Sequence, residues 1–206
     1  MTPHLRRALW PLAAILPILI WSGIGPYEYG TWLLEVAPVF IAFPLILATA
    51  RRFPLSMLLL VLIVLHSYVL VVGGHYTYAR VPLGEWAQEW FGWQRNNYDK
   101  IGHFWQGFMP AILTREILLR RSPLPRGKWL NFLIVSVCLA FSACFEMLEW
   151  MVALALGGAD NFLGTQGYVW DTQSDMAWAG VGAIVALALL RRLHDRSMER
   201  LPKAAA

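Results

Sequence analysis

Acidic and imidazole side chains recur at helical spacing in three stretches of this 206-residue sequence, each followed or surrounded by apolar residues. Residues three or four positions apart share one face of a helix, so each stretch would present a single polar stripe. The stripes consist of Asp99, His103 and Gln106, of Glu146 and Glu149, and of Asp171 and Asp175. The apolar residues around the stripes indicate membrane-spanning helices, and ionisable side chains are costly inside a membrane. We therefore expect the three stripes to face one another around a shared polar cavity.

The balance of charge in this cavity favours a bound cation. Five carboxylates oppose only Lys100 and Arg95, so either some carboxylates are protonated or a cation neutralises them. Carboxylates together with one imidazole suit divalent ions such as Mn²⁺, Fe²⁺, Zn²⁺ or Mg²⁺. The sequence therefore predicts one divalent metal ion, of undetermined identity. Its expected ligands are Glu146, Asp171, Asp175 and His103.

The same residue types can transfer protons and bind an anionic substrate. The expected catalytic residues are His103, Glu149 and Asp99. The expected substrate-binding residues are Lys100, Arg95, Asn97, Tyr76, Gln166 and Gln173, the first two as partners of an anion. The alternative is a structural network of ion pairs and hydrogen bonds that locks three helices together.

The sequence as a whole has the composition of a membrane protein. Hydrophobic residues make up 58% of the chain and charged residues 15%, whereas a soluble domain has roughly a quarter of its residues charged. This excludes soluble enzymes, disordered regulators and secreted disulfide scaffolds. The apolar runs are too long and too uniform for barrel strands, so we predict an all-α membrane bundle.

Six stretches are long enough to cross about 30 Å of hydrocarbon at about 1.5 Å per residue. We predict a single integral membrane domain, residues 1–206, with spans at residues 8–25, 32–50, 55–73, 99–119, 129–156 and 169–190. The fourth and sixth spans begin with polar residues, which weakens their hydropathy. Between the third and fourth spans, tryptophans alternate with acidic residues at about 84–93, which predicts a segment in the outer membrane interface.

Basic residues fall almost entirely on one side of these spans. Only Arg80, Arg95 and Lys100 of the 17 lysines and arginines lie on the other side, so the positive-inside rule predicts that both termini are cytoplasmic. The polar cluster would then face the periplasm or cell exterior. The net charge of +4 is explained by this topology, and no nucleic-acid partner is expected. Pro11 and Pro17 interrupt the first apolar run, which favours an uncleaved helix over a signal peptide.

Four polar residues outside the stripes lead to separate expectations. His66, in the middle of the third span, is interpreted as a hydrogen-bonded core residue. Arg115, near the cytoplasmic end of the fourth span, is expected to extend to the headgroups. His75 is expected at the edge of the cavity. For Glu35 the pattern leaves two alternatives open, the same cavity or the headgroup layer.

Four segments carry a family resemblance: HYTYARVP at 75–82, RNNYDKIGHFWQGFMPAILTREIL at 95–118, FEMLEW at 145–150 and GTQGYVWDTQSDM at 164–176. They resemble the YjdF-like family of bacterial inner-membrane proteins, a domain of unknown function, over nearly the whole chain. The order of DKxxHF, a later Glu and a final Asp-x-x-x-Asp is more distantly similar to the VanZ-like membrane family, which is linked to glycopeptide tolerance. Glu146 and Glu149 stand where that family has Glu-x-x-Gln.

The first resemblance implies a multi-pass protein of the bacterial cytoplasmic (inner) membrane. The positions that carry it into the polar cluster are Asp99, His103, Glu146, Glu149, Gln166, Asp171 and Asp175. We expect a membrane-embedded enzyme at the outer leaflet, a metal-assisted hydrolase or transferase acting on a lipid headgroup or lipid-linked envelope substrate. Its partners would be membrane lipids and that substrate, and the sequence leaves its oligomeric state undetermined. Two alternatives stay open: a cation- or proton-coupled transporter, and a non-catalytic envelope accessory protein with a structural polar cluster.

Overall fold

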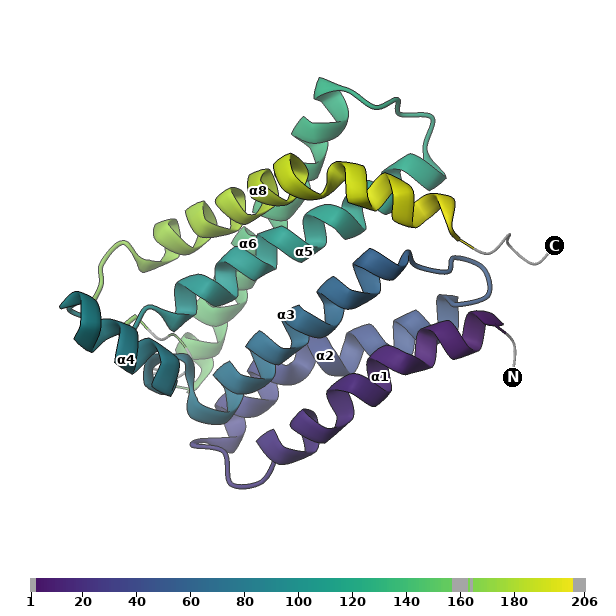
Figure 1. Cartoon of the computed structure of the whole chain (residues 1–206). Helices are drawn as coiled ribbons and strands as arrows, with labels where there is room; N and C mark the ends of the chain where they lie inside the picture. The colour runs from purple at the N-terminus through teal and green to yellow at the C-terminus, as the bar shows by residue number, and fades with distance from the viewer. Residues whose placement is uncertain (1–2, 157–162, 164, 202–206) are drawn as a thin grey trace.

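The fold is all-α in the computed structural model, which describes residues 3–156, 163 and 165–201. Six long helices run back and forth between two ends of the molecule (Figure 1). They are α1 (Pro3–Ser22), α2 (Tyr29–Thr49), α3 (Met57–Tyr76), α5 (Tyr98–Arg121), α6 (Lys128–Leu156) and α8 (Asp171–Glu199). A 3₁₀ turn, η1 (Tyr78–Arg80), and the short helix α4 (Pro82–Phe91) connect α3 to α5.

Five of the long helices are long and apolar enough to cross a membrane: α1, α2, α3, α6 and α8. The chain is therefore a polytopic membrane bundle. Helix α5 has sufficient length, at 24 residues, but its sequence is too polar to qualify by composition. It packs against α3, α6 and α8, which bury its polar side chains. A sixth span at α5 stays a prediction, because its neighbours rather than its own residues would make it compatible with lipid.

Helices α5 and α8 approach one another very closely through small residues. A Cβ atom on Gly107 would collide with the main-chain carbonyl of Ala179, and one on Gly182 would collide with the carbonyl of Phe104. Small residues at such crossings allow main chains to touch, which is a common way for membrane helices to associate. This crossing sets the rotation of α8 relative to α5 and brings their polar first turns together.

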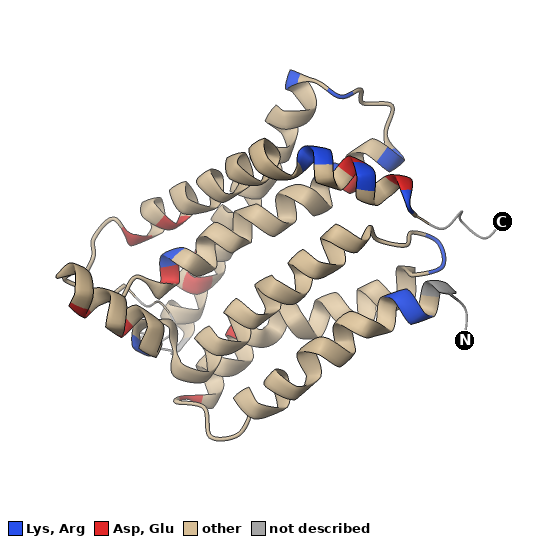
Figure 2. Cartoon of the chain, in the orientation of Figure 1, with Lys and Arg blue, Asp and Glu red and all other residues tan. Residues whose placement is uncertain are grey.

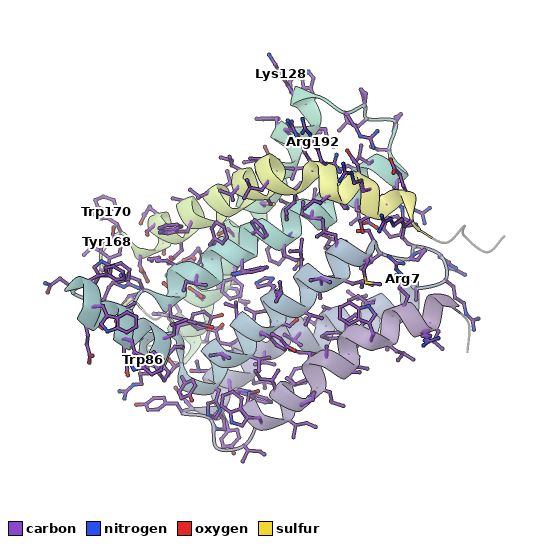
Figure 3. All side chains as sticks on the ribbon, viewed as in Figure 1. Arg7, Trp86, Lys128, Tyr168, Trp170 and Arg192 are labelled. Atoms are coloured by element: carbon purple, nitrogen blue, oxygen red, sulfur yellow. The ribbon has the colours of Figure 1, made fainter. Side chains whose placement is uncertain are left out.

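Charged residues gather at the two ends of the bundle and leave its middle largely uncharged (Figure 2). Both termini lie at one end, and α4 lies at the other (Figure 1). Arg7, Lys128 and Arg192 lie in the half that carries the termini, whereas the aromatic side chains of Trp86 and Tyr168 lie near α4 (Figure 3). This distribution agrees with the expected sidedness, although Lys203 lies outside the described residues.

The end that carries the termini contains a buried ionic network. Glu116 is fully buried and accepts hydrogen bonds from the main-chain N–H of Ser56 at 3.0 Å, from Arg120 Nη1 at 2.6 Å and from His194 Nε2 at 2.9 Å. Arg115 donates to His194 Nδ1 at 2.9 Å. Since an arginine can only donate, Nδ1 of His194 accepts and Nε2 carries the proton.

The expectation that Arg115 extends to the headgroups is wrong. Its side chain is 5% exposed, because it bonds His194 and also reaches Asp195 at 2.9 Å. The bond between Ser56 and Glu116 connects the start of α3 to α5. The bond between His194 and Glu116 connects α8 to α5. The network is therefore an anchor between three helices rather than a headgroup contact.

Candidate functional site

The polar stripes of α5, α6 and α8 meet at the end of the bundle near α4. The first turns of α5 and α8 lie side by side there (Figure 1), and each carries an acidic residue, Asp99 on α5 and Asp171 on α8 (Figure 2). Seven ionisable side chains of these three helices are buried at this end. They are Asp99, Lys100, His103, Glu146, Glu149, Asp171 and Asp175.

Hydrogen bonds between the side chain of Gln166 and the main chain of Asn96 hold the start of α5 against the segment before α8. Gln166 accepts a hydrogen bond from the Asn96 N–H at 3.0 Å and donates to the Asn96 carbonyl at 2.8 Å. Arg95 also donates to the Thr165 carbonyl at 3.2 Å. These bonds join residues 70 positions apart in the sequence. Because the side chain of Gln166 is used in these bonds, its role in this structure is to position the cluster rather than to line an open cavity.

Two cations bridge the aspartates of the cluster. Arg95 Nη1 lies 2.6 Å from Asp171 Oδ1, and its Nη2 lies 3.3 Å from Asp99. Lys100 Nζ lies 2.8 Å from Asp171, 2.5 Å from Asp175 and 3.3 Å from Asp99. One oxygen of Asp171 thus contacts both cations, and the expected metal ligand Asp171 is an ion-pair partner here.

His103 lies at the centre of the remaining carboxylates. Its Nδ1 lies 3.0 Å from Gln106 Oε1, which accepts the Nδ1 proton and turns Nε2 toward the acidic side chains. Nε2 is 3.3 Å from Asp99 Oδ1, 3.8 Å from Glu146 Oε1 and 3.8 Å from Asp175 Oδ2. Hydrogen bonding at one ring nitrogen is the usual way in which a protein orients a metal-binding histidine.

The spacing of these atoms suits a metal ion. Asp99, His103 and Asp175 offer ligand atoms within 4.8 Å of one another. For metal–ligand distances of about 2.0–2.2 Å, tetrahedral ligand atoms lie roughly 3.3–3.6 Å apart. Glu146 Oε1 is buried and finds no hydrogen-bond partner among the described residues, although its carboxylate contacts Thr172. An unpartnered buried oxygen beside this group is the position that a fourth ligand would take.

Tyr78 extends the polar cluster toward α2. Its ring lies between Gly73 of α3 and Gly102 of α5, where any Cβ atom would collide with it. Its hydroxyl bonds Glu35, which is 5% exposed. Burial, followed by the nearby charge of Glu35, raises the pKa of Tyr78 well above its ordinary value. Glu35 therefore faces the cavity rather than the headgroup layer, and Glu149 lines the same cavity.

Three of the expected substrate-binding residues lie apart from the acidic centre. Gln173 is exposed on α8, since two residues from Asp171 the helix has turned to its opposite face. Tyr76 packs edge-on against His75 with ring centres 4.7 Å apart, within an aromatic group of α1 and α3. Asn97 is half-buried at the start of α5, where its main-chain carbonyl accepts from the Lys100 N–H.

The expectation that His75 lies at the edge of the cavity is wrong. Its Nδ1 hydrogen-bonds the Ser22 carbonyl at 3.0 Å, and its ring lies 4.2 Å from that of Trp21. The His75 carbonyl accepts from the Tyr27 N–H. The two hydrogen bonds of His75 attach the end of α1 and the α1–α2 connection to α3. His66 is buried as expected, stacks on Trp105 with ring centres 6.3 Å apart and lines the cavity. Its Nε2 has no hydrogen-bond partner among the described residues, so the expected hydrogen bond is not found at that atom.

Comparison with known proteins identifies the family. Residues 8–196 match the family described as "Predicted membrane protein (DUF2238)". The chain belongs to this family. It is also 54% identical over 184 residues to the inner membrane protein YjdF of Escherichia coli strain K12, an alignment that covers 89% of this chain and 88% of its relative. The YjdF-like resemblance of the four sequence segments is thus confirmed.

Membership of the DUF2238 family supports a multi-pass inner-membrane protein, as the helices also indicate. The family description names no activity. No solved structure matches the chain. The chemistry of the family must therefore be inferred from the buried cluster itself.

Sequence reasoning identified the contacts around the cluster only in part. Glu35 was left undecided, although a lone carboxylate in the outer part of an apolar helix is a signal for a membrane cavity. The closeness of Tyr78 to the fourth span in the sequence predicts a place on the cavity rim, but nothing in the sequence indicates its bond to Glu35. At the other end of the bundle, no signal marked His194, because it is defined by contacts with a helix distant in sequence.

Proposed function

We propose that this protein is a metal-assisted hydrolase or transferase that acts on a lipid headgroup or lipid-linked substrate at the outer leaflet. The observation that carries the proposal is the convergence of Asp99, His103 and Asp175 beside the unpartnered Glu146 oxygen. A nitrogen and three carboxylate oxygens form a ligand set for Zn²⁺, Mn²⁺ or Fe²⁺. Bound there, such an ion would lower the pKa of a water ligand and polarise a phosphoryl or carbonyl oxygen.

The surrounding residues then have separate roles. Glu149 lines the cavity beside the group and would take the proton of the attacking water as the new bond to phosphorus or carbon forms. The same carboxyl would return that proton to the leaving oxygen as the old bond breaks. Lys100, already 3.3 Å from Asp99, would stabilise the developing negative charge.

We propose that the site faces outward because of the distribution of basic residues between the two ends of the bundle. The cluster lies near α4, opposite both termini (Figures 1 and 2), and the basic residues of the terminal end favour the cytoplasm. The cluster would therefore meet headgroups of the periplasmic leaflet.

Two measurements on purified protein test the proposal together. Elemental mass spectrometry should find near-stoichiometric metal in the wild type and little in an Asp99→Asn, Asp175→Asn variant, with Gln173→Asn as a matched control on an exposed face of α8. The reloaded wild type, in vesicles of inner-membrane lipid extract, should convert a headgroup or lipid-linked species that His103→Gln leaves unchanged. Absence of metal after reloading would overturn the metal site, and metal without lipid conversion would overturn the enzyme.

A transporter is the second candidate, favoured by polar groups beyond the cluster. His66 and Ser67 line the same cavity midway along α3, and Thr49 and Arg121 line it at the far end. Uptake of protons or a divalent cation into proteoliposomes, abolished by Glu149→Gln, would establish transport in place of catalysis.

A non-catalytic accessory role is favoured by the ion pairs of Lys100. Its contacts with three aspartates of α5 and α8 are those expected of a structural lock. The signs of the stability changes described below for Glu146 and Asp171 separate this role from a metal site.

A further inference from the structure

A long groove of about 850 Å³ extends from the polar cluster along the bundle. Its walls come from α2, α3, α5 and α6. Helix α3 packs on α2 and α5, and α5 packs on α6, whereas no extensive contact joins α2 to α6 in the described part of the chain. Figure 1 shows α2 and α6 behind α3 and α5 in this view. The groove is therefore partly open between α2 and α6, on a side of the bundle that faces the bilayer.

The groove has its largest group of polar side chains at one end and is apolar along most of its length, with Thr49 and Arg121 at the far end. The residues at the polar end are Glu35, Tyr78, Asp99, His103, Gln106 and Glu149. Beyond them the lining is dominated by aliphatic and aromatic side chains, among them Leu70, Met109, Leu113, Phe141 and Ile41. A volume of several hundred Å³ with polar groups at one end is typical of a site for an amphiphilic ligand.

The length of the groove selects the kind of amphiphile. Its lining residues on α5 run from Asp99 to Arg121, a distance of about 33 Å at roughly 1.5 Å per residue. The hydrocarbon core is about 30 Å thick and contains two leaflets, so the tail of an ordinary phospholipid extends about 15 Å. A chain that fills the groove must be about twice as long as such a tail.

We propose that the groove binds the hydrocarbon chain of a polyprenyl phosphate, with the phosphate at the Asp99 and His103 end. A polyprenyl phosphate combines a single chain longer than one leaflet with a terminal anion. The chain would enter from the bilayer between α2 and α6. The phosphate would bind the metal held at His103 and the ammonium of Lys100. This inference rests on the proposed function, since it names the lipid class of that same site.

Native mass spectrometry of the detergent-purified protein tests chain and headgroup separately. The probes are undecaprenyl phosphate, farnesyl phosphate, which has the same headgroup on a short chain, and phosphatidylglycerol. We expect undecaprenyl phosphate to be retained at least tenfold more strongly than either of the others. Equal retention of farnesyl phosphate would overturn the role of the long chain, and equal retention of phosphatidylglycerol would overturn the polyprenyl class.

A pair of variants on α2 localises the binding. Ala42 lines the groove, whereas Ala48 is exposed on the same helix and does not line it. Ala42→Trp should reduce retention of undecaprenyl phosphate at least tenfold, while Ala48→Trp should leave it unchanged. Equal retention by both variants would overturn the site. The chain-length comparison on the wild type decides the proposal even where Ala42→Trp fails to fold.

The metal content of the same samples distinguishes the two proposals. Metal without retention of undecaprenyl phosphate would overturn the lipid assignment and leave the metal site intact. Retention without metal would support the groove and overturn metal-assisted catalysis. Loss of retention in Arg121→Gln, with none in Asp99→Asn, would place the phosphate at the opposite end and overturn the proposed orientation.

Discussion

At the residue scale, the chemistry of the cluster depends on the orientation of His103. Gln106 occupies Nδ1 at 3.0 Å, and this leaves Nε2 among three carboxylates. An imidazole held in this way presents one fixed nitrogen to a metal ion or a proton. The site therefore depends on an uncharged residue of the same helix as well as on its acidic side chains.

Replacing Gln106 should weaken metal binding without removing a ligand. In Gln106→Leu the His103 ring loses the partner that orients it, so we expect metal affinity to fall about 10- to 100-fold. Titration of the apo protein with Zn²⁺ or Mn²⁺ measures the change. Gln173→Leu, on the exposed face of α8, is the control and should bind metal as the wild type does. Equal affinities in both variants would contradict the orienting role.

Glu146 and Asp171 should respond to neutralisation with opposite signs. Glu146 Oε1 is buried without a hydrogen-bond partner in the described chain, so Glu146→Gln should raise the stability of the metal-free protein by about 0.5–2 kcal/mol. Asp171 pairs with both Arg95 and Lys100, so Asp171→Asn should lower it by about 1–3 kcal/mol. Thermal unfolding in detergent with chelator compares them. Destabilisation by both changes would instead favour a purely structural lock.

At the element scale, the crossing of α5 and α8 determines which polar faces meet. Gly107 and Gly182 allow the main chains to touch, and the hydrogen bonds between Asn96 and Gln166 fix the same pair of segments at the polar end. The Glu116 network joins them again at the far end. A long polar helix is thus held at both ends and in its middle.

Alanine at Gly182 should disturb this crossing. Its Cβ would meet the carbonyl of Phe104, a main-chain atom that cannot turn aside, so we expect a loss of about 1–3 kcal/mol. Gly30→Ala is the matched control, because no atom lies within 4 Å of its Cβ position and α2 should tolerate alanine well. Comparison of the two melting temperatures in the same detergent measures the difference. A loss in Gly30→Ala as large as in Gly182→Ala would contradict the close-packing explanation.

Removing Glu116 should cost more than removing Asp195. Glu116→Ala would leave Arg120, His194 and the Ser56 N–H without their buried acceptor, a loss of about 3–5 kcal/mol. Asp195 is 30% exposed in its ion pair with Arg115, so Asp195→Ala should cost less than about 1 kcal/mol. Thermal unfolding again provides the measurement, and equal losses would show that burial does not set the cost.

At the scale of the whole molecule, the structure separates a basic end with both termini from an end that carries α4 and the polar cluster (Figures 1 and 2). The positive-inside rule predicts that the basic end faces the cytoplasm. With this orientation, a substrate would reach the cluster from the periplasmic side of the membrane.

Cysteine labelling tests the orientation directly. In a Cys138→Ala, Cys144→Ala background, Glu89→Cys on α4 should react with an impermeant maleimide added outside the cytoplasmic membrane. Arg196→Cys, exposed near the end of α8, should react only after the membrane is opened. The reverse pattern would invert the topology and turn the cluster toward the cytoplasm.

The sequence by itself determined the class of the protein and the residues on each polar stripe. Composition requires a membrane bundle, and helical spacing places Asp99 with His103 and Glu146 with Glu149 whatever their surroundings. Both conclusions depend on local properties of the chain: the transfer of side chains into lipid and the period of a helix.

Only the tertiary structure decided which partner each stripe residue meets. Asp171 pairs with Arg95 and Lys100 rather than joining the group around His103, and Tyr78 brings Glu35 into the cavity. Arg115 is drawn inward by His194, 79 residues away. Spacing establishes the face of a helix but not its rotation against a neighbour, and that rotation is set by packing between distant residues such as Gly182 and Phe104.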